Sequence, residues 1–251
     1  MADSVEELIH NKIREKGAIQ MTLLDPQKTD RSICVEIAEE AEKGGTTAIM
    51  VGGSTLASNS DLDDVVKEIK TRVKVPVILF PNNISGVSRH ADAIWFMSLL
   101  NSRSTYYIID VQALTAHLIR RYGIEALPLG YIIIGDGGAA GFVGQARGIP
   151  YDHPELALGY SLAAETLGIR FIYLEAGSGA KAPVPLEMIK LVKKHISVPL
   201  VVGGGIRDGH AAKAAVEAGA DIIVTGTLVE GTSKVRESIN EIVSHIESKG
   251  R

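Results

Sequence analysis

The chain has 251 residues, of which 45% are hydrophobic and 22% are charged, and its formal net charge at pH 7 is −4. This length and apolar content suffice for one large core and are typical of an eight-stranded α/β barrel, so we expect one domain over residues 1–251. The negative balance argues against a broad nucleic-acid-binding surface, although it is compatible with a local basic pocket for a phosphorylated substrate.

The single cysteine, Cys34, has no partner for a disulfide and falls in an apolar helical pattern, so we expect a core residue in a cytoplasmic protein. Residues 1–15 show acids and a helical pattern instead of a basic stretch followed by an apolar run, so no signal peptide is evident. Apolar runs such as 131–134 are short and end in glycine or charge, so we expect no integral membrane segment.

In chain order, apolar strand-like runs alternate with amphipathic helical stretches, the pattern of repeated βα units and a parallel sheet. The expected strands are residues 19–24, 47–51, 77–80, 93–97, 130–134, 170–174, 200–202 and 222–225. The expected helices are residues 32–43, 62–72, 106–122, 154–167, 185–195, 209–218 and 233–247. The interval 81–91 is too short for a full helix, so we expect the helix after the third strand to be reduced or replaced by a loop.

Eight parallel strands in a chain of this length favour a closed (β/α)8 TIM barrel, because a barrel leaves no exposed edge. An open, doubly wound sheet is the alternative. It would place a GxGxxG turn after the first strand, where this chain has Asp25-Pro26-Gln27-Lys28 instead. In a barrel, catalytic groups lie at the C-terminal ends of the strands, and phosphate is usually held after strands seven and eight.

The last three strands each end in a glycine-rich segment: Tyr173 to Gly179, Gly203 to Gly209, and Gly226-Thr227. Such segments expose backbone N–H groups without obstructing side chains, which is how proteins cradle a phosphate. Any one of them could be no more than a tight strand-to-helix turn. Three on neighbouring strands favour phosphate binding.

Glu175 ends the sixth strand, where a carboxylate points into the barrel mouth and could accept a proton from a substrate hydroxyl. The alternative is a structural ion pair with a neighbour such as Lys181. Tyr173 lies on the same side of the strand as Glu175, because side chains alternate along a strand. It could hydrogen-bond the substrate or fill the barrel core.

Asp25 closes the first strand, and Ser54 follows the second. One carboxylate and one hydroxyl, completed by substrate oxygens and water, commonly hold Mg²⁺ against a diphosphate. Spacing alone supports this only weakly, because Asp25-Pro26 is also a turn signal and Ser54 could cap the segment that follows.

Other features are expected not to carry chemistry. Asp61, Asp63 and Asp64 follow Ser60 at a helix start, where acids favour the helix dipole. The seven histidines show neither HExxH nor Cys/His zinc spacing. Strand four and the segment after it leave one side of the mouth apolar, and that side could hold a lipid tail; the residues are Trp95, Phe96, Met97, Leu99, Leu100, Tyr106 and Tyr107.

Six segments form a specific set: Leu24-Asp25-Pro26, Gly52-Gly53-Ser54, Phe96 to Ser102, Tyr173 to Gly179, Gly203 to Gly209 and Thr225-Gly226-Thr227. In these segments, and over nearly its whole length, the chain resembles the geranylgeranylglyceryl phosphate synthases. These are archaeal barrel prenyltransferases of ether-lipid biosynthesis that join a C20 prenyl diphosphate, geranylgeranyl diphosphate, to sn-glycerol 1-phosphate.

The resemblance implies that Asp25 and Ser54 bind Mg²⁺ and that the protein forms a homo-oligomer. With Glu175 as the catalytic base, it implies that glycerol phosphate is bound by Tyr173, Leu174, Glu175, Ala176, Gly177, Ser178, Gly179, Gly204, Gly205, Gly226 and Thr227. The length of the prenyl chain stays open, with Trp95, Tyr106 and Tyr107 as candidates to block the apolar groove.

The bacterial heptaprenylglyceryl phosphate synthases look similar, but they typically carry a lysine two residues before the metal-binding aspartate and a shorter loop after the glutamate. This chain has Leu23 at the first position and the longer Ala176-Gly177-Ser178-Gly179 at the second, which favours the archaeal type. Without that lysine, Arg147, Lys181 or Arg207 could contact phosphate, and the sequence does not rank them.

Two other functions stay open on the sequence. A phosphate-binding barrel isomerase or lyase is allowed by fold analogy, but it would need a second proton-transferring residue or a Schiff-base lysine inside the barrel, and no expected strand offers such a lysine. A non-catalytic protein that binds phosphoesters or lipids is the other.

Overall fold

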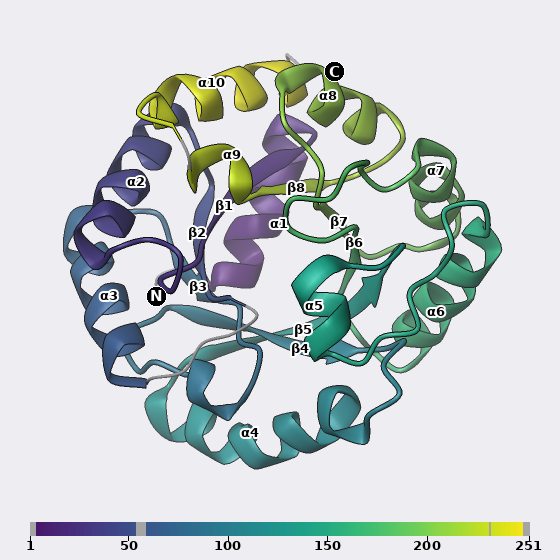
Figure 1. Ribbon diagram of the computed structural model, residues 1–251, viewed down its shortest axis with the longest axis horizontal. Helices are drawn as coiled ribbons and strands as arrows, with labels where there is room; N and C mark the ends of the chain where they lie inside the picture. Colours follow the sequence, from purple (N-terminus) through teal and green to yellow (C-terminus); the bar gives the residue numbers. More distant parts are fainter. Residues whose placement is uncertain (1–3, 54–58, 231, 248–251) are drawn as a thin grey trace.

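Eight parallel strands close into a barrel in sequence order, as the computed structural model of residues 4–53, 59–230 and 232–247 shows (Figure 1). The strands are β1 (Ile19–Leu24), β2 (Ala48–Val51), β3 (Val77–Leu79), β4 (Ala93–Leu99), β5 (Glu125–Ile133), β6 (Phe171–Glu175), β7 (Leu200–Gly203) and β8 (Ile222–Thr225). β1 pairs with β8, with Ile19 opposite Ile222. The closed barrel is therefore confirmed, and the open sheet is excluded.

Helices surround the barrel. The outer ones are α2 (Arg31–Gly44), α3 (Asn59–Arg72), α4 (Val111–Tyr122), α6 (Pro154–Thr166), α7 (Leu186–His195), α8 (Gly209–Glu217) and α10 (Val235–Ile246). Inside this ring lie the N-terminal helix α1 (Val5–Lys16) and the short helices α5 (Gly138–Val143) and α9 (Thr227–Glu230) (Figure 1). Among the residues described, none of the helices is both long and apolar enough to cross a membrane.

The segment between β3 and β4 holds only a 3-10 turn, η1 (Ile84–Gly86), as its length predicts. A π-helical stretch, η2 (Tyr106–Asp110), precedes α4 inside the region expected to be a single helix. Both irregularities flank β4, so the barrel wall near that strand has the least regular helical cover.

β5 starts at Glu125, five residues before the expected strand of residues 130–134. The added residues include Pro128, and proline has no N–H to donate to a ladder. In the structure the Pro128 carbonyl faces β6 and accepts from the Arg170 N–H at 3.2 Å. The N–H that proline lacks would point toward residues before Phe171, where β6 has not yet begun to pair with β5. No hydrogen bond of the β5–β6 ladder is therefore lost.

Alternation along the strands separates two apolar layers. Met21, Met50 and Phe171 belong to the cluster inside the barrel. Ile172 and Leu174 belong to the cluster between the sheet and the helices. Tyr173 and Glu175 therefore face inward and Leu174 faces outward, as the period of two predicts for β6.

Cys34 is fully buried in α2, as expected. Burial, and after it the negative charges of Asp25, Glu230 and Asp30, raise the pKa of the Cys34 thiol to about 12. The thiol is therefore protonated at neutral pH, and the protonated form is not the nucleophile.

We expect the native protein to react with a chromogenic disulfide reagent far more slowly than the protein unfolded in guanidinium. Absorbance at neutral pH measures both rates, and Cys34→Ala, which removes the only thiol, sets the background. Fast stoichiometric labelling of the native protein would contradict the burial of this side chain.

Candidate active site

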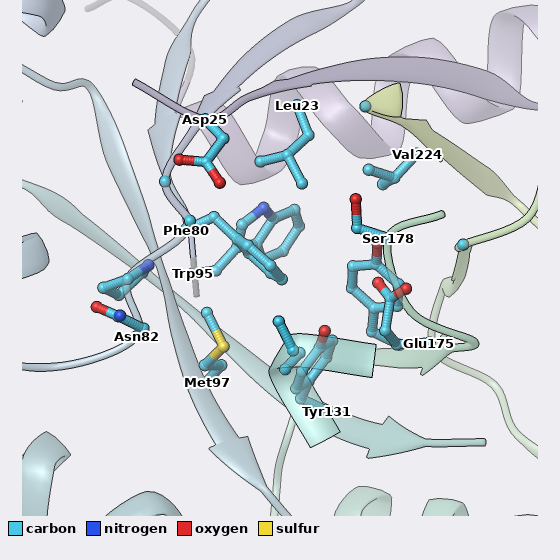
Figure 2. A pocket seen from close by; sticks show the side chains of 18 of the residues that line it. Leu23, Asp25, Phe80, Asn82, Trp95, Met97, Tyr131, Glu175, Ser178 and Val224 are labelled. Carbon is cyan, nitrogen blue, oxygen red and sulfur yellow. The ribbon is translucent and has the colours of Figure 1, made fainter. Parts of the chain in front are cut away.

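A cavity of about 600 Å³ opens at the C-terminal ends of the strands. Figure 2 shows Asp25 on one side, Glu175 and Ser178 on the other, and Phe80 and Trp95 between them. Its charged lining residues are Asp25, Lys28, Glu175, Arg207 and Glu230. The cavity therefore combines acidic, basic and apolar walls in one space.

The glycine segments after β6 and β7 meet at one wall. Gly177, Gly204 and Gly205 have φ values of +105°, +82° and +73°, in the left-handed region that favours glycine. A Cβ on Gly204 would lie 2.6 Å from both Glu175 Oε1 and the Gly177 nitrogen. Only glycine at this position lets the two loops approach so closely.

The segment after β8 joins the same wall. The hydroxyls of Ser178 and Thr227 lie 3.2 Å apart, which links the β6 loop to the start of α9. Gly226 precedes Thr227, and both line the cavity. The three glycine segments thus form one surface, as expected from their positions at neighbouring strand ends.

Glu175 is held by neutral groups. Gly177 N–H donates to Glu175 Oε1 at 2.6 Å, and the side chain is 6% exposed. Burial raises the pKa of Glu175, while hydrogen bonds from Tyr173, the Gly177 N–H and Tyr131 oppose that rise. Within the described parts of the chain no cation pairs with this carboxylate, so the ion pair with Lys181 does not form.

Tyr131 and Tyr173 belong to the same unit, with ring centroids 5.1 Å apart in an edge-on arrangement. Burial, followed by the nearby charge of Glu175, raises the pKa of both phenols well above its ordinary value, so both stay protonated and can donate. A Cβ on Gly203 would lie 2.1 Å from the Tyr173 hydroxyl. Gly203 therefore makes room for Tyr173 beside Glu175.

Most residues expected to bind glycerol phosphate line the cavity: Tyr173, Glu175, Ser178, Gly179, Gly204, Gly205, Gly226 and Thr227. Leu174 and Ala176 do not, because their side chains pack outward against the helices. Gly177 is engaged with the Glu175 carboxylate instead. These three residues have only backbone groups to offer a substrate. Tyr131 is an addition that the sequence reasoning missed.

Asp25 lies against the β2 loop. A Cβ on Gly53 would lie 2.3 Å from Asp25 Oδ1, so the missing side chain leaves room for the carboxylate. Oδ1 accepts from the Gln27 N–H at 3.1 Å, and Oδ2 lies 3.5 Å from Lys28 Nζ. Ser54, the other expected ligand, lies outside the described residues. A buried, hard oxygen donor already facing a cation fits Mg²⁺.

The described residues contain no group of three or more His, Cys, Asp or Glu side chains that could hold a metal ion unaided. Mg²⁺ usually takes one or two protein carboxylates and completes its shell with phosphate oxygens and water.

The apolar side of the cavity is built from both faces of β4. Trp95 and Met97 face the barrel interior, whereas Ile94 and Phe96 face α4. Tyr107 also lines the cavity; Tyr106 does not, and it packs edge-on against Tyr107 with ring centroids 5.1 Å apart. The lining thus continues from the barrel mouth through the gap beside β4 toward α4.

Of the three cations that the sequence offered as phosphate contacts, Arg207 lines the cavity, whereas Arg147 and Lys181 do not. Arg207 Nη2 donates to the Ala180 carbonyl at 3.2 Å, which ties it to the glycine wall. Lys28 lines the opposite, Asp25 side. The sequence showed Lys28 only as part of a turn.

Residues 10–246 match the PcrB family. A geranylgeranylglyceryl phosphate synthase of Thermofilum pendens is 51% identical over 97% of this chain and 95% of its own. The synthase of Thermococcus kodakarensis is 52% identical over 95% of each chain. Both identities extend over almost the full barrel.

Comparison with solved structures finds the same type of synthase as comparison of the sequences. The (S)-3-O-geranylgeranylglyceryl phosphate synthase of Thermoplasma acidophilum, in complex with its substrate sn-glycerol-1-phosphate, matches with a TM-score of 0.94 and 42% identity, over 98% of this chain and 99% of its own. A thiamine phosphate pyrophosphorylase of Pyrococcus furiosus, with a TM-score of 0.63 and 16% identity, shares the fold alone. The chain therefore belongs to the PcrB family and is of the geranylgeranylglyceryl phosphate synthase type, as its motifs predicted.

Proposed function

We propose that this protein transfers the geranylgeranyl group of geranylgeranyl diphosphate to the terminal hydroxyl of sn-glycerol 1-phosphate, as a step of ether-lipid biosynthesis. The main support is the position of Glu175, a buried carboxylate with a raised pKa between a glycine wall and an apolar wall. The relatives named above and the substrate complex of the Thermoplasma acidophilum enzyme support the same assignment.

The glycine wall binds the acceptor in this proposal. Backbone N–H groups at Gly204 and Gly205, with the hydroxyls of Ser178 and Thr227, suit the phosphate, because such groups donate without a bulky side chain. The phosphate then fixes the glycerol hydroxyl near Glu175. Positioning of this kind lowers the barrier by removing the entropy cost of the encounter.

Glu175 acts as the general base. Its raised pKa makes it a stronger proton acceptor than an exposed carboxylate, and Tyr131 and Tyr173 hold it in place. As the glycerol oxygen bonds to prenyl C1, the bond from C1 to the diphosphate oxygen breaks and its electron pair leaves with diphosphate. The hydroxyl proton passes to Glu175.

Asp25, with Ser54, would hold Mg²⁺ on the donor side. When bound there, the ion would offset the charge that develops on the leaving diphosphate. The prenyl chain would lie along the apolar wall, where Trp95 and Tyr107 are the candidates that limit its length. We further propose that the protein works as a cytoplasmic homo-oligomer close to a membrane surface.

The defining assay is release of diphosphate. We expect release from geranylgeranyl diphosphate only when both sn-glycerol 1-phosphate and Mg²⁺ are present, because both substrates must occupy the cavity together. Heptaprenyl diphosphate as the better donor would indicate the bacterial-type activity. Absence of release with every prenyl donor would reject the transferase and leave a sugar-phosphate enzyme or a binding protein.

Glu175→Gln keeps the size of the side chain and removes the base, so we expect turnover to fall by roughly 100-fold or more. In the unchanged protein, activity should rise with pH through a midpoint above the ordinary glutamate value of 4.5, because burial raises this pKa. Glu187→Gln, at an exposed carboxylate on α7, is the matched control. Near-normal turnover of Glu175→Gln would remove Glu175 from this role.

Glu175→Gln should also raise the melting temperature at neutral pH. The folded-state pKa of Glu175 lies above its unfolded value, so the stability that this group contributes is complete below the unfolded pKa and is lost as pH rises through the folded pKa. Glutamine stays neutral and avoids that loss. Melting curves at several pH values test this; an equal gain in acid would show that charge burial is not its cause.

A further inference from the structure

Lys28 connects two carboxylates at the donor side of the cavity. Its Nζ lies 3.5 Å from Asp25 Oδ2 and 3.8 Å from Glu230 Oε1. The Lys28 N–H donates to the Asp25 carbonyl at 3.1 Å, so the turn after β1 folds the lysine back over the aspartate. All three side chains line the cavity.

The Lys28 side chain is more exposed than the two carboxylates that it faces. Its side chain is 51% exposed, whereas those of Asp25 and Glu230 are 8% and 18% exposed. Both separations exceed the usual length of an N–H···O hydrogen bond. The ammonium is therefore half-exposed and held by no close hydrogen bond within the described residues, so it can move away once another cation takes its place beside the carboxylates.

The charge balance around Lys28 is incomplete. Two carboxylates and one ammonium leave one net negative charge on the side of the cavity where the diphosphate would lie. Arg207, the other cation in the lining, belongs to the glycine wall. On the Asp25 side, Lys28 is thus the cation, among the described lining residues, that can reach a leaving diphosphate.

We propose that Lys28 is the positioning residue for the diphosphate of the prenyl donor, and that it offsets part of the negative charge of Asp25 and Glu230 until a metal ion binds at Asp25. This inference rests on the function proposed above. With a metal ion bound at Asp25, the Lys28 ammonium would be repelled from that carboxylate and could turn on its flexible stem toward the diphosphate. Lysine suits this task because it binds phosphate as a mobile point charge.

Lys28→Met should have two effects of opposite sign, weaker binding of the donor and tighter binding of Mg²⁺. Loss of a charged contact should weaken donor binding, so we expect the KM for geranylgeranyl diphosphate to rise about tenfold or more. The KM for sn-glycerol 1-phosphate should change less than twofold. Mg²⁺ alone should bind the free variant several-fold more tightly, because the competing ammonium is gone.

Steady-state kinetics measure the change in donor KM. Calorimetric titration of the substrate-free protein with Mg²⁺ measures the change in metal binding, and titration with inorganic diphosphate in excess Mg²⁺ measures diphosphate binding without turnover. Lys28→Arg restores the charge and should recover most of the donor affinity. Lys190→Met, at an exposed lysine of α7, is the matched control and should behave as the unchanged protein.

An unchanged donor KM in Lys28→Met would overturn the proposal, as would Mg²⁺ and diphosphate weakening together, which is the mark of a merely structural role. If Lys28→Met folds poorly by its melting curve, the comparison of Lys28→Arg with the unchanged protein decides, because arginine keeps the charge. Failure of the proposed function is separate: it would appear as absent diphosphate release in the unchanged protein.

Discussion

A carboxylate held inside a barrel by neutral donors is the constraint around which the rest of this site is arranged. Glu175 sits at the end of β6 with a backbone N–H and two phenols as its partners. Each partner needs space, and two glycines provide it: Gly203 beside the Tyr173 hydroxyl and Gly204 beside the carboxylate itself. The glycine wall therefore makes room for Glu175 and its partners, in addition to the phosphate that we propose it binds.

Barrel closure brings together the Asp25 side of the cavity and the glycine wall, which we propose as the donor and acceptor sides. β1 and β8 pair with Thr22 opposite Thr225, so the loop that carries Asp25 begins next to the loop that carries Gly226 and Thr227. Lys28 and Glu230 extend that junction by one ion pair. Residues separated by almost the whole sequence thus form one edge of the cavity, because parallel strands place all their C-terminal ends at the same face.

Much of the fold could be predicted from periodicity. β1 and β8 agree with the sequence to the residue, and the reduced segment after β3 follows from its length. Contacts that depend on the register between neighbouring strands could not be predicted from the sequence. Tyr131 faces Tyr173 only because Leu129 pairs with Phe171, and no local pattern sets that register.

In the site, too, some residues could be predicted from local sequence and others only from the three-dimensional structure. Tyr173, Glu175, Gly204 and Thr227 could be placed because each lies at a strand end, where the barrel itself determines direction. Lys28 could not, since a lysine in a turn is ordinary until its partner on α9 is known. Ranking Arg207 above Arg147 and Lys181 likewise required the path of the loops.

The apolar wall has a further consequence for how the donor pocket can diverge. Because that wall uses both faces of β4, half of it belongs to the packing layer between sheet and helices, and substitutions there leave the interior of the barrel unaltered. Glu175, Tyr131 and Tyr173 face the barrel interior, on the other side of the sheet. The donor selectivity that we propose for this wall can therefore drift in evolution while Glu175 and its tyrosine partners keep their geometry.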